Sequence, residues 1–350
     1  LQRAEDYLKE AGMEVKLFEG IESDPSVETV MKGAQVMTEF EPDWIVAIGG
    51  GSPIDAAKAM WIKYEYPDTT FEDMCKVFGL PQLRRKAHFC AVSSTSGTAT
   101  EVTAFSIITD YHKGIKYPIA DFEITPDVAI VDPELAETMP VKLVAHTGMD
   151  AMTHGIEAYV STANCDFTDP LALHAIMMIR DNLVKSYNGD MEARDAMHNA
   201  QCLAGMAFNL VNLGVNHGIA HALGAIFHIP HGRANALVLP YVIEFNADMA
   251  REGAKHSNDA AKKYQKMARI VGLPAPTPKV GVANLIAEIQ RLLKYMDRPQ
   301  CMSECGVSVE EFNKHREEIV RRALADACTQ ANPRKVTAED INKILDHIAK

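Results

Sequence analysis

The chain has 350 residues, of which 47% are hydrophobic and 23% are charged. At roughly 150 residues a domain this length suggests two domains, and the composition excludes a collagen, a coiled-coil rod and a disordered chain. Lys and Arg total 35 against 47 for Asp and Glu, so the formal net charge is −12. Such an acidic surface repels nucleic acids and anionic membranes, and we expect neither as a partner.

The first 140 residues alternate between segments with helical spacing and short apolar runs. Residues 25–40 and 53–64 have apolar side chains at helical spacing, and the run 44–50 ends in glycines. Residues 88–94, 101–110 and 126–133 are further expected strands. Helices placed between short, continuously apolar strands indicate βαβ units and a mainly parallel sheet.

After Pro140 the helical segments dominate, so we predict an α/β domain over residues 1–147 and an all-helical domain over 148–350. A charged stretch, 246–265, is the expected linker between two of these helices. Residues 199–232 hold no Asp, Glu, Lys or Arg. They do hold Asn, Gln and His side chains that would be costly to bury in lipid, which favours a helix in a protein core over a membrane span.

The segment 48–58, IGGGSPIDAAK, predicts a strand that passes through three glycines into a helix. We expect Ser52 to be the N-cap, Pro53 to occupy the first helical position and Asp55 to complete the capping pattern. The free N–H groups of such a helix start suit a pyrophosphate, although a plain tight turn would show the same residues. The hydroxyl-rich loop 93–103 could wrap phosphate or ribose, or could only satisfy its own backbone.

Histidines and one aspartate gather in the helical half of the chain. Asp150 and His154 are four residues apart, so they share a helix face, and His217 and His221 have the same spacing. Carboxylate and imidazole groups presented together suit a divalent transition metal, whereas an isolated histidine is usually a core residue. Spacing alone predicts that His217 and His221 are the second pair of metal ligands and that His231 is not a ligand.

With these motifs assembled, the chain resembles the iron-containing (group III) alcohol dehydrogenases from about Gly20 to Cys328. The resemblance is closest to the butanol, propanediol and lactaldehyde reductase type and to the alcohol dehydrogenase part of bifunctional aldehyde-alcohol dehydrogenases. The motifs that carry it occur in order: GGGSPxDAAK, the Ser/Thr-Gly-Thr-x-x-Glu-Val-Thr loop, GxDAxxHxxEAY, HGxAHxLG and HxPHGxANA.

The resemblance implies a dinucleotide-binding domain, a helical metal domain and an active site between them. It places the metal ligands on Asp150, His154, His217 and His231, which overrules the spacing argument and leaves His221 beside the metal, near the nicotinamide. The implied cofactor contacts are Gly50, Gly51, Ser52, Ser94, Thr95, Thr98, Lys116 and the segment from Leu135 to Met139, with Phe105 and Cys328 as pocket neighbours.

The implied activity is hydride transfer between a small primary alcohol or diol, or its aldehyde, and NAD(H) or NADP(H). Fe²⁺ is the expected metal, although Zn²⁺ would suit the same ligands. His221 is the expected proton relay or hydrogen-bond partner of the substrate. The alternatives are a polyol dehydrogenase of the glycerol type, a dehydroquinate-synthase-like lyase, and a non-catalytic subunit that binds metal or nucleotide.

The sequence opens at Leu1, whereas family members usually open with a strand whose terminal Asp helps to choose between NAD and NADP. We expect that this front strand is missing here, which leaves the cofactor preference open. A missing strand would expose a sheet edge, and a homodimer or a larger homo-oligomer is expected. Seven scattered cysteines, an odd number, favour a reducing compartment and a cytoplasmic location.

Overall fold

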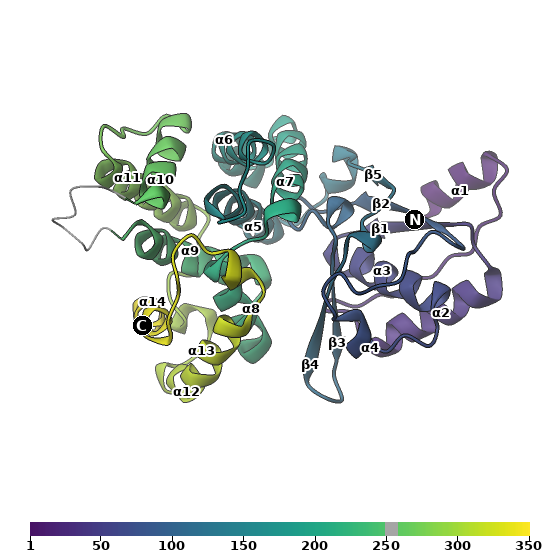
Figure 1. Ribbon diagram of the computed structural model, residues 1–350. Coiled ribbons are helices and arrows are strands. Elements are labelled where there is room, and N and C mark those ends of the chain that lie inside the picture. Colours follow the sequence, from purple (N-terminus) through teal and green to yellow (C-terminus); the bar gives the residue numbers. More distant parts are fainter. Residues whose placement is uncertain (249–257) are drawn as a thin grey trace. The chain divides into compact units, whose positions relative to one another are not determined.

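The chain divides into two compact units, whose residues can be followed in Figure 1 by the colours that run along the sequence. The first comprises residues 1–95 and 99–135, and the second comprises residues 96–98 and 136–350. The structure is a computed structural model that describes residues 1–248 and 258–350. The boundary expected at residue 147 falls inside helix α5 (Val141–Val160), because that helix begins soon after the units divide.

The first unit contains a parallel sheet and a separate antiparallel hairpin. The sheet has the strand order β1-β2-β5, with β1 at Trp44–Gly49, β2 at His88–Ser93 and β5 at Val128–Ile130. The hairpin pairs β3 (Phe105–Asp110) with β4 (Ile115–Ala120). The expected α/β class is therefore confirmed. The strand expected over 101–110 starts later than predicted, because its first residues form the 3₁₀ turn η1 (Thr100–Val102).

Helix α3 (Gly51–Glu65) is the centre of the first unit's core. It follows α1 (Gln2–Glu10) and α2 (Val27–Phe40), and it precedes α4 (Phe71–Met74) and the 3₁₀ turns η2 (Phe122–Ile124) and η3 (Pro133–Ala136). Every α3 residue from Ala56 to Glu65 is buried. Its Trp61 ring stacks on Phe89 of β2 with ring centroids 5.3 Å apart.

The start of α3 differs from the predicted one. Gly50 is the N-cap, and Ser52 already lies in the first turn, where its hydroxyl accepts a hydrogen bond from the Asp24 N–H at 3.3 Å. The expected Ser52 cap is therefore wrong. The physical reason is the glycine turn: Gly49 has a φ of +153°, and a Cβ there would lie 2.7 Å from the Pro53 Cγ. The chain can therefore enter the helix earlier than a serine cap would require.

The second unit is built of helices. They are α5, α6 (Asp169–Tyr187), α7 (Met191–Val211), α8 (Val215–Phe227), α9 (His231–Ala247), α10 (Asp259–Ile270), α11 (Pro278–Tyr295), α12 (Val309–Lys314), α13 (Arg316–Ala325) and α14 (Ala338–Ile348), with 3₁₀ turns η4 (Ser303–Cys305) and η5 (Cys328–Ala331). The helical class expected for this half is confirmed. Of the linker expected over 246–265, residues 259–265 belong to α10, and residues 249–257 lie outside the described part.

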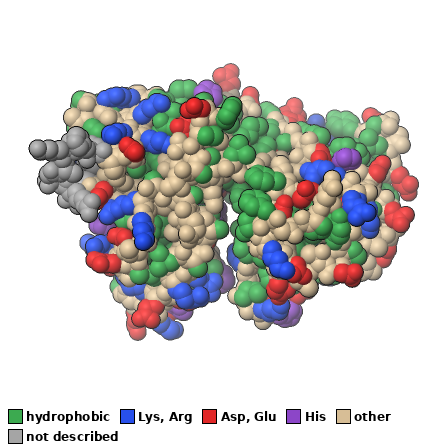
Figure 2. Space-filling view, viewed as in Figure 1, with side chains coloured by type: hydrophobic (Ala, Val, Ile, Leu, Met, Phe, Trp, Pro, Cys, Tyr) green, Lys and Arg blue, Asp and Glu red, His purple; other side chains and the backbone are tan. Residues whose placement is uncertain are grey.

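Two surface properties bear on the choice of partners. Among the described residues, no single helix is long and apolar enough to span a membrane; α7 and α8 together satisfy that test only as a pair bent by 104°. On the face drawn in Figure 2, Lys and Arg side chains are dispersed among acidic ones in both units.

The burial of Trp61 predicts a large cost for its removal. Trp61 has 0% exposure, so we expect Trp61→Ala to destabilise the first unit by about 3–5 kcal/mol, because the cavity left in a packed core is only partly refilled. Urea unfolding followed by circular dichroism measures this change. Trp44→Ala is the matched control, since Trp44 is 43% exposed and its loss should change stability by about 0.5 kcal/mol or less. Equal losses would contradict the described core.

Candidate metal centre

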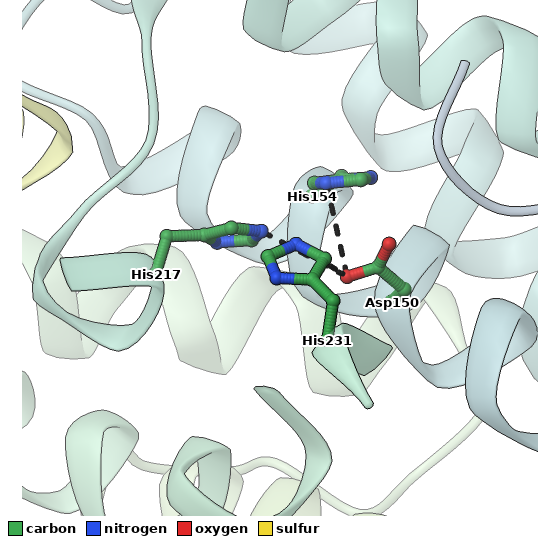
Figure 3. Close-up of side chains that lie close together, drawn as sticks. All are labelled: Asp150, His154, His217 and His231. Atoms are coloured by element: carbon green, nitrogen blue, oxygen red, sulfur yellow. Dashed lines mark ion pairs between the residues drawn. The ribbon is translucent and has the colours of Figure 1, made fainter. Parts of the chain in front are cut away.

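Four side chains from three helices converge in the second unit (Figure 3). Asp150 and His154 lie one turn apart on α5, His217 lies in the first turn of α8, and His231 is the first residue of α9. The Asp150 Oδ1 atom is 3.9, 3.8 and 3.5 Å from the Nε2 atoms of His154, His217 and His231. All four candidate ligand atoms lie within 4.8 Å of one another.

The chemistry of these four groups fits a divalent transition metal. Bonds of about 2.1 Å in a tetrahedral arrangement separate neighbouring ligand atoms by roughly 3.4 Å, close to the separations seen here. Asp150 is buried, and burial raises the pKa of its carboxyl group. Burial also lowers the pKa of His154 and His217, so that their imidazoles remain neutral and able to act as ligands. A cation would compensate the charge of the buried carboxylate.

The turn between α8 and α9 explains how His231 reaches the cluster. Gly232 lies against α5 so closely that an added Cβ would overlap the His146 carbonyl oxygen and lie 3.2 Å from the Asp150 Cβ. Glycine is therefore needed for the start of α9 to approach Asp150. This contact places His231 near Asp150, although helical spacing alone had not predicted His231 as part of the site.

Two further polar residues hold the ligands in place. The Glu157 carboxylate contacts the His217 Nδ1 atom and accepts a hydrogen bond from the Asn216 N–H at 3.0 Å. Asn235 donates to the Asp150 Oδ1 atom at 2.7 Å, and its amide nitrogen lies 3.0 Å from the His217 Nε2 atom. A carboxylate on the far nitrogen of a ligating histidine fixes its orientation and raises its basicity.

Sequence reasoning missed Glu157 and Asn235 as parts of this site. A signal for Glu157 was present, because it lies three residues after His154 and shares the same helix face. A charged side chain in such an apolar helix needs a partner. Asn235 lies four residues after His231, which is again the spacing of one helix face.

His221 belongs to a different group from the one that its spacing suggested. Its Nδ1 atom lies 2.8 Å from the Asp326 Oδ2 atom, and its ring stacks on the His231 ring with centroids 5.2 Å apart. Its candidate ligand atom clusters with those of Asp326 and Cys328 instead. The pairing of His217 with His221 as metal ligands is therefore not the grouping in the structure, because Asp326, distant in sequence, engages His221.

The predicted cofactor residues of the first unit lie around the start of α3. The Ser94 N–H donates to the Gly49 carbonyl at 2.8 Å, and a Cβ on Gly50 would lie 3.0 Å from the Thr95 Cγ2. The Lys116 ammonium on β4 pairs with the Asp24 carboxylate at 2.9 Å. Because the Asp24 backbone N–H contacts the Ser52 hydroxyl, the structure brings Lys116 toward the same helix start.

The remaining predicted cofactor residues are distributed between the two units. Gly51 is the first residue of α3, Phe105 begins β3, and Leu135 ends the first unit. Thr98 and Met139 belong to the second unit, where Met139 is buried.

Lys58 anchors the end of the hydroxyl-rich loop and the start of β3. Its ammonium is fully buried and donates to three backbone carbonyls, those of Thr100 at 2.8 Å, Thr103 at 2.5 Å and Phe105 at 3.1 Å. One turn earlier, the Asp55 carboxylate accepts a hydrogen bond from the Ile107 N–H at 3.0 Å. Burial lowers the pKa of Lys58 and raises that of Asp55. Helix α3 thus carries the glycine turn at its start and anchors residues 100–107 along its side.

Comparison with known proteins identifies the family. Residues 1–133 match the family described as iron-containing alcohol dehydrogenase, and residues 144–349 match the C-terminal part of the Fe-containing alcohol dehydrogenase family. The chain therefore belongs to the iron-containing alcohol dehydrogenase family. The resemblance inferred from the motifs is confirmed, and so is the predicted arrangement of an α/β unit followed by a helical one.

Individual relatives agree with this assignment. The chain is 58% identical over 340 residues to an NADPH-dependent butanol dehydrogenase of Clostridium saccharobutylicum, which covers 97% of this chain and 85% of that protein. It is 41% identical to aldehyde-alcohol dehydrogenase 2 of Entamoeba histolytica over 99% of this chain, but spans only 41% of that protein's length. The iron-containing alcohol dehydrogenase of Thermococcus thioreducens superposes with a TM-score of 0.90 at 35% identity, over 99% of this chain and 88% of that one.

The close approach at Gly232 predicts that a single methyl group will weaken metal binding. We expect Gly232→Ala to push the start of α9 away from α5 and to lower the affinity for Fe²⁺ by roughly tenfold or more. Competition with a chelator, under anaerobic conditions, measures this affinity. Gly224→Ala is the matched control, since its Cβ would meet only the Ile229 carbonyl at 3.4 Å. Unchanged affinity in Gly232→Ala would show that His231 is not a ligand.

Proposed function

We propose that this protein is an NAD(P)-linked, iron-dependent alcohol dehydrogenase that interconverts a small primary alcohol or diol and its aldehyde. The observation that carries the proposal is the convergence of one buried carboxylate and three imidazoles on a single point. The family assignment supports the same chemistry, and the relatives named above do not favour a polyol dehydrogenase, a lyase or a non-catalytic subunit.

Asp150, His154, His217 and His231 are the proposed metal ligands. Fe²⁺ is the metal that the family name supports, and Zn²⁺ is chemically compatible with the same three nitrogens and one oxygen. When bound, the ion would supply Lewis-acid stabilisation of the substrate oxygen. The neutral imidazoles and the carboxylate would hold it, while Glu157 and Asn235 would keep the ligands in their orientation.

The chain's own residues would also handle the cofactor and the proton. The N–H groups at the start of α3, from Gly50 to Ser52, would bind the pyrophosphate, and the Thr95 side chain and the Ser94 residue beside it would assist. We propose that Thr98, Lys116, Leu135 and Met139 make the other cofactor contacts. His221, stacked on His231, would hydrogen-bond the substrate oxygen and exchange its proton with solvent.

The substrate, cofactor and cellular setting are proposed from chemistry and from the relatives. A small alcohol and a phosphorylated nicotinamide cofactor are supported by the butanol dehydrogenase, whose name states NADPH dependence, although NAD(H) remains part of the proposal. All seven cysteines are free thiols, which is typical of the cytoplasm. We further propose a homodimer or a larger homo-oligomer, because folds with exposed sheet edges commonly cover them by self-association.

Removing the metal should abolish turnover reversibly. We expect chelator-treated protein to lose alcohol-dependent reduction of NAD(P)⁺, and added Fe²⁺ to restore more activity than Zn²⁺. His217→Ala should lose metal and activity together, because His217 provides a buried ligand that no neighbouring group replaces. Anaerobic metal analysis combined with an assay on butanol and propanediol measures both quantities. Full metal content and an unchanged rate in His217→Ala would rule out the ligand assignment.

The contacts of Lys58 predict a specific effect on cofactor binding. Lys58→Met keeps an unbranched side chain that is one atom shorter but removes all three hydrogen bonds to residues 100–105, so that this segment loses its anchor on α3. We expect the KM for the nicotinamide cofactor to rise by about tenfold or more, as follows from about 1.4 kcal/mol or more of lost binding energy. The KM for the aldehyde and the iron content should remain near those of the unmodified protein. Lys63→Met, which removes a buried lysine from the same helix, is the control.

A further inference from the structure

A second group of metal-ligating side chains lies beside the first one. His221 of α8, Asp326 at the end of α13 and Cys328 at the start of η5 offer a nitrogen, an oxygen and a sulfur atom that all lie within 4.8 Å of one another. The proposed iron site uses none of these three as a ligand. The proposed iron site therefore does not explain why these three side chains lie together.

Close packing holds this group together before any ligand arrives. One turn before His221, a Cβ on Gly218 would overlap the Thr329 hydroxyl and lie 3.0 Å from the Ala323 carbonyl. The Thr329 hydroxyl donates to that carbonyl at 2.6 Å, and the Cys328 N–H donates to the Asp326 Oδ1 atom at 2.9 Å. The loop that carries Asp326 and Cys328 is thus pressed against α8, so the three ligand atoms are pre-positioned.

The donor set differs from that of the iron site in one important respect, because it contains a thiol. Thiolate, imidazole and carboxylate together are characteristic of Zn²⁺ and of other thiophilic cations. The side chains of His221 and Asp326 are 30% and 20% exposed, so an ion could enter from solvent. Three protein ligands would leave one tetrahedral position for water.

We propose that His221, Asp326 and Cys328 form a second metal site, which binds a thiophilic divalent cation such as Zn²⁺ and thereby inhibits the enzyme. On binding, the Cys328 thiol releases its proton to the buffer and its thiolate bonds to the cation. The His221 Nδ1 atom exchanges its contact with Asp326 for the cation, and the imidazole stays neutral with its proton on Nε2. Inhibition follows because the ring is then fixed in place and can no longer exchange a proton with the substrate.

Cation binding at the second site and inhibition of the enzyme rest on different observations. Binding at the second site rests only on the three side chains and on the packing around Gly218. Inhibition rests in addition on the proposed function, because it requires His221 to act on the substrate. The ring of His221 stacks on His231 at an interplanar angle of 16°, which places the second cation next to the ligands of the first.

Binding is tested with Cd²⁺, whose bond to a thiolate absorbs in the near ultraviolet. Protein loaded anaerobically with Fe²⁺ is titrated with Cd²⁺ while absorbance and retained iron are measured. We expect one Cd²⁺ per chain to bind with a thiolate band and without loss of iron. Cys328→Ala should lose the band, and Asp326→Asn, which keeps the thiol, should weaken binding roughly tenfold or more.

Two variants serve as controls for the other thiols. Cys165→Ala removes an exposed cysteine and should leave the band unchanged. Cys301→Ser tests a different cation site. Cys301 and Cys305 lie four residues apart, so their two thiols could hold a cation together. A band that survives Cys328→Ala, unchanged Cd²⁺ affinity in Asp326→Asn, or a band that Cys301→Ser removes would overturn the second site.

Inhibition is tested separately, with each variant compared to its own rate without zinc. The concentration of Zn²⁺ that halves alcohol oxidation should rise about tenfold or more in Cys328→Ala, while iron remains bound throughout. Zinc that inhibits only as iron is lost, or that inhibits Cys328→Ala equally, would overturn the inhibitory role. If no variant oxidises any alcohol, the proposed function fails, and the Cd²⁺ titration still decides whether the site exists.

Discussion

The rest of the helical unit depends on one constraint, the burial of the Asp150 carboxylate among neutral imidazoles. Within residues 1–248 and 258–350, no Lys or Arg forms an ion pair with Asp150, whose neighbours are three histidines and the Asn235 amide. An uncompensated carboxylate is costly to bury, and a cation bound among these four side chains would offset that cost. Metal binding at this point would therefore be coupled to the packing of α5, α8 and α9.

In the first unit, one helix, α3, likewise positions the candidate cofactor residues. Helix α3 is buried along most of its length and carries the glycine turn at its start. Through Lys58 and Asp55 it binds the end of the hydroxyl-rich loop and the strand that follows. In each unit, a glycine lets a neighbouring segment of the chain approach closely, and a buried polar side chain holds the surrounding residues in position. Gly50 and Lys58 have these roles in the first unit, and Gly232 and Glu157 have them in the second.

Local patterns in the sequence predicted the fold class, the α/β half, the helical half and the pairing of Asp150 with His154, because these depend on spacing within single elements. They did not predict that Gly50 caps α3, that Glu157 holds His217 or that Asp326, 105 positions after His221, engages that histidine. These contacts join elements far apart in the chain, which periodicity cannot reveal. The prediction of His231 as a ligand came from family resemblance rather than from spacing, and the contact at Gly232 brings its helix start close to Asp150.

The most direct test of the account is the position of the iron itself. Crystals grown anaerobically with Fe²⁺, measured with anomalous diffraction at the iron absorption edge, should show a peak bonded to Asp150, His154, His217 and His231. Each bond should be about 2.0–2.2 Å long, as is typical of transition-metal bonds to nitrogen and oxygen. A peak bonded to His221 in place of His231, or no peak among these four side chains, would contradict the account.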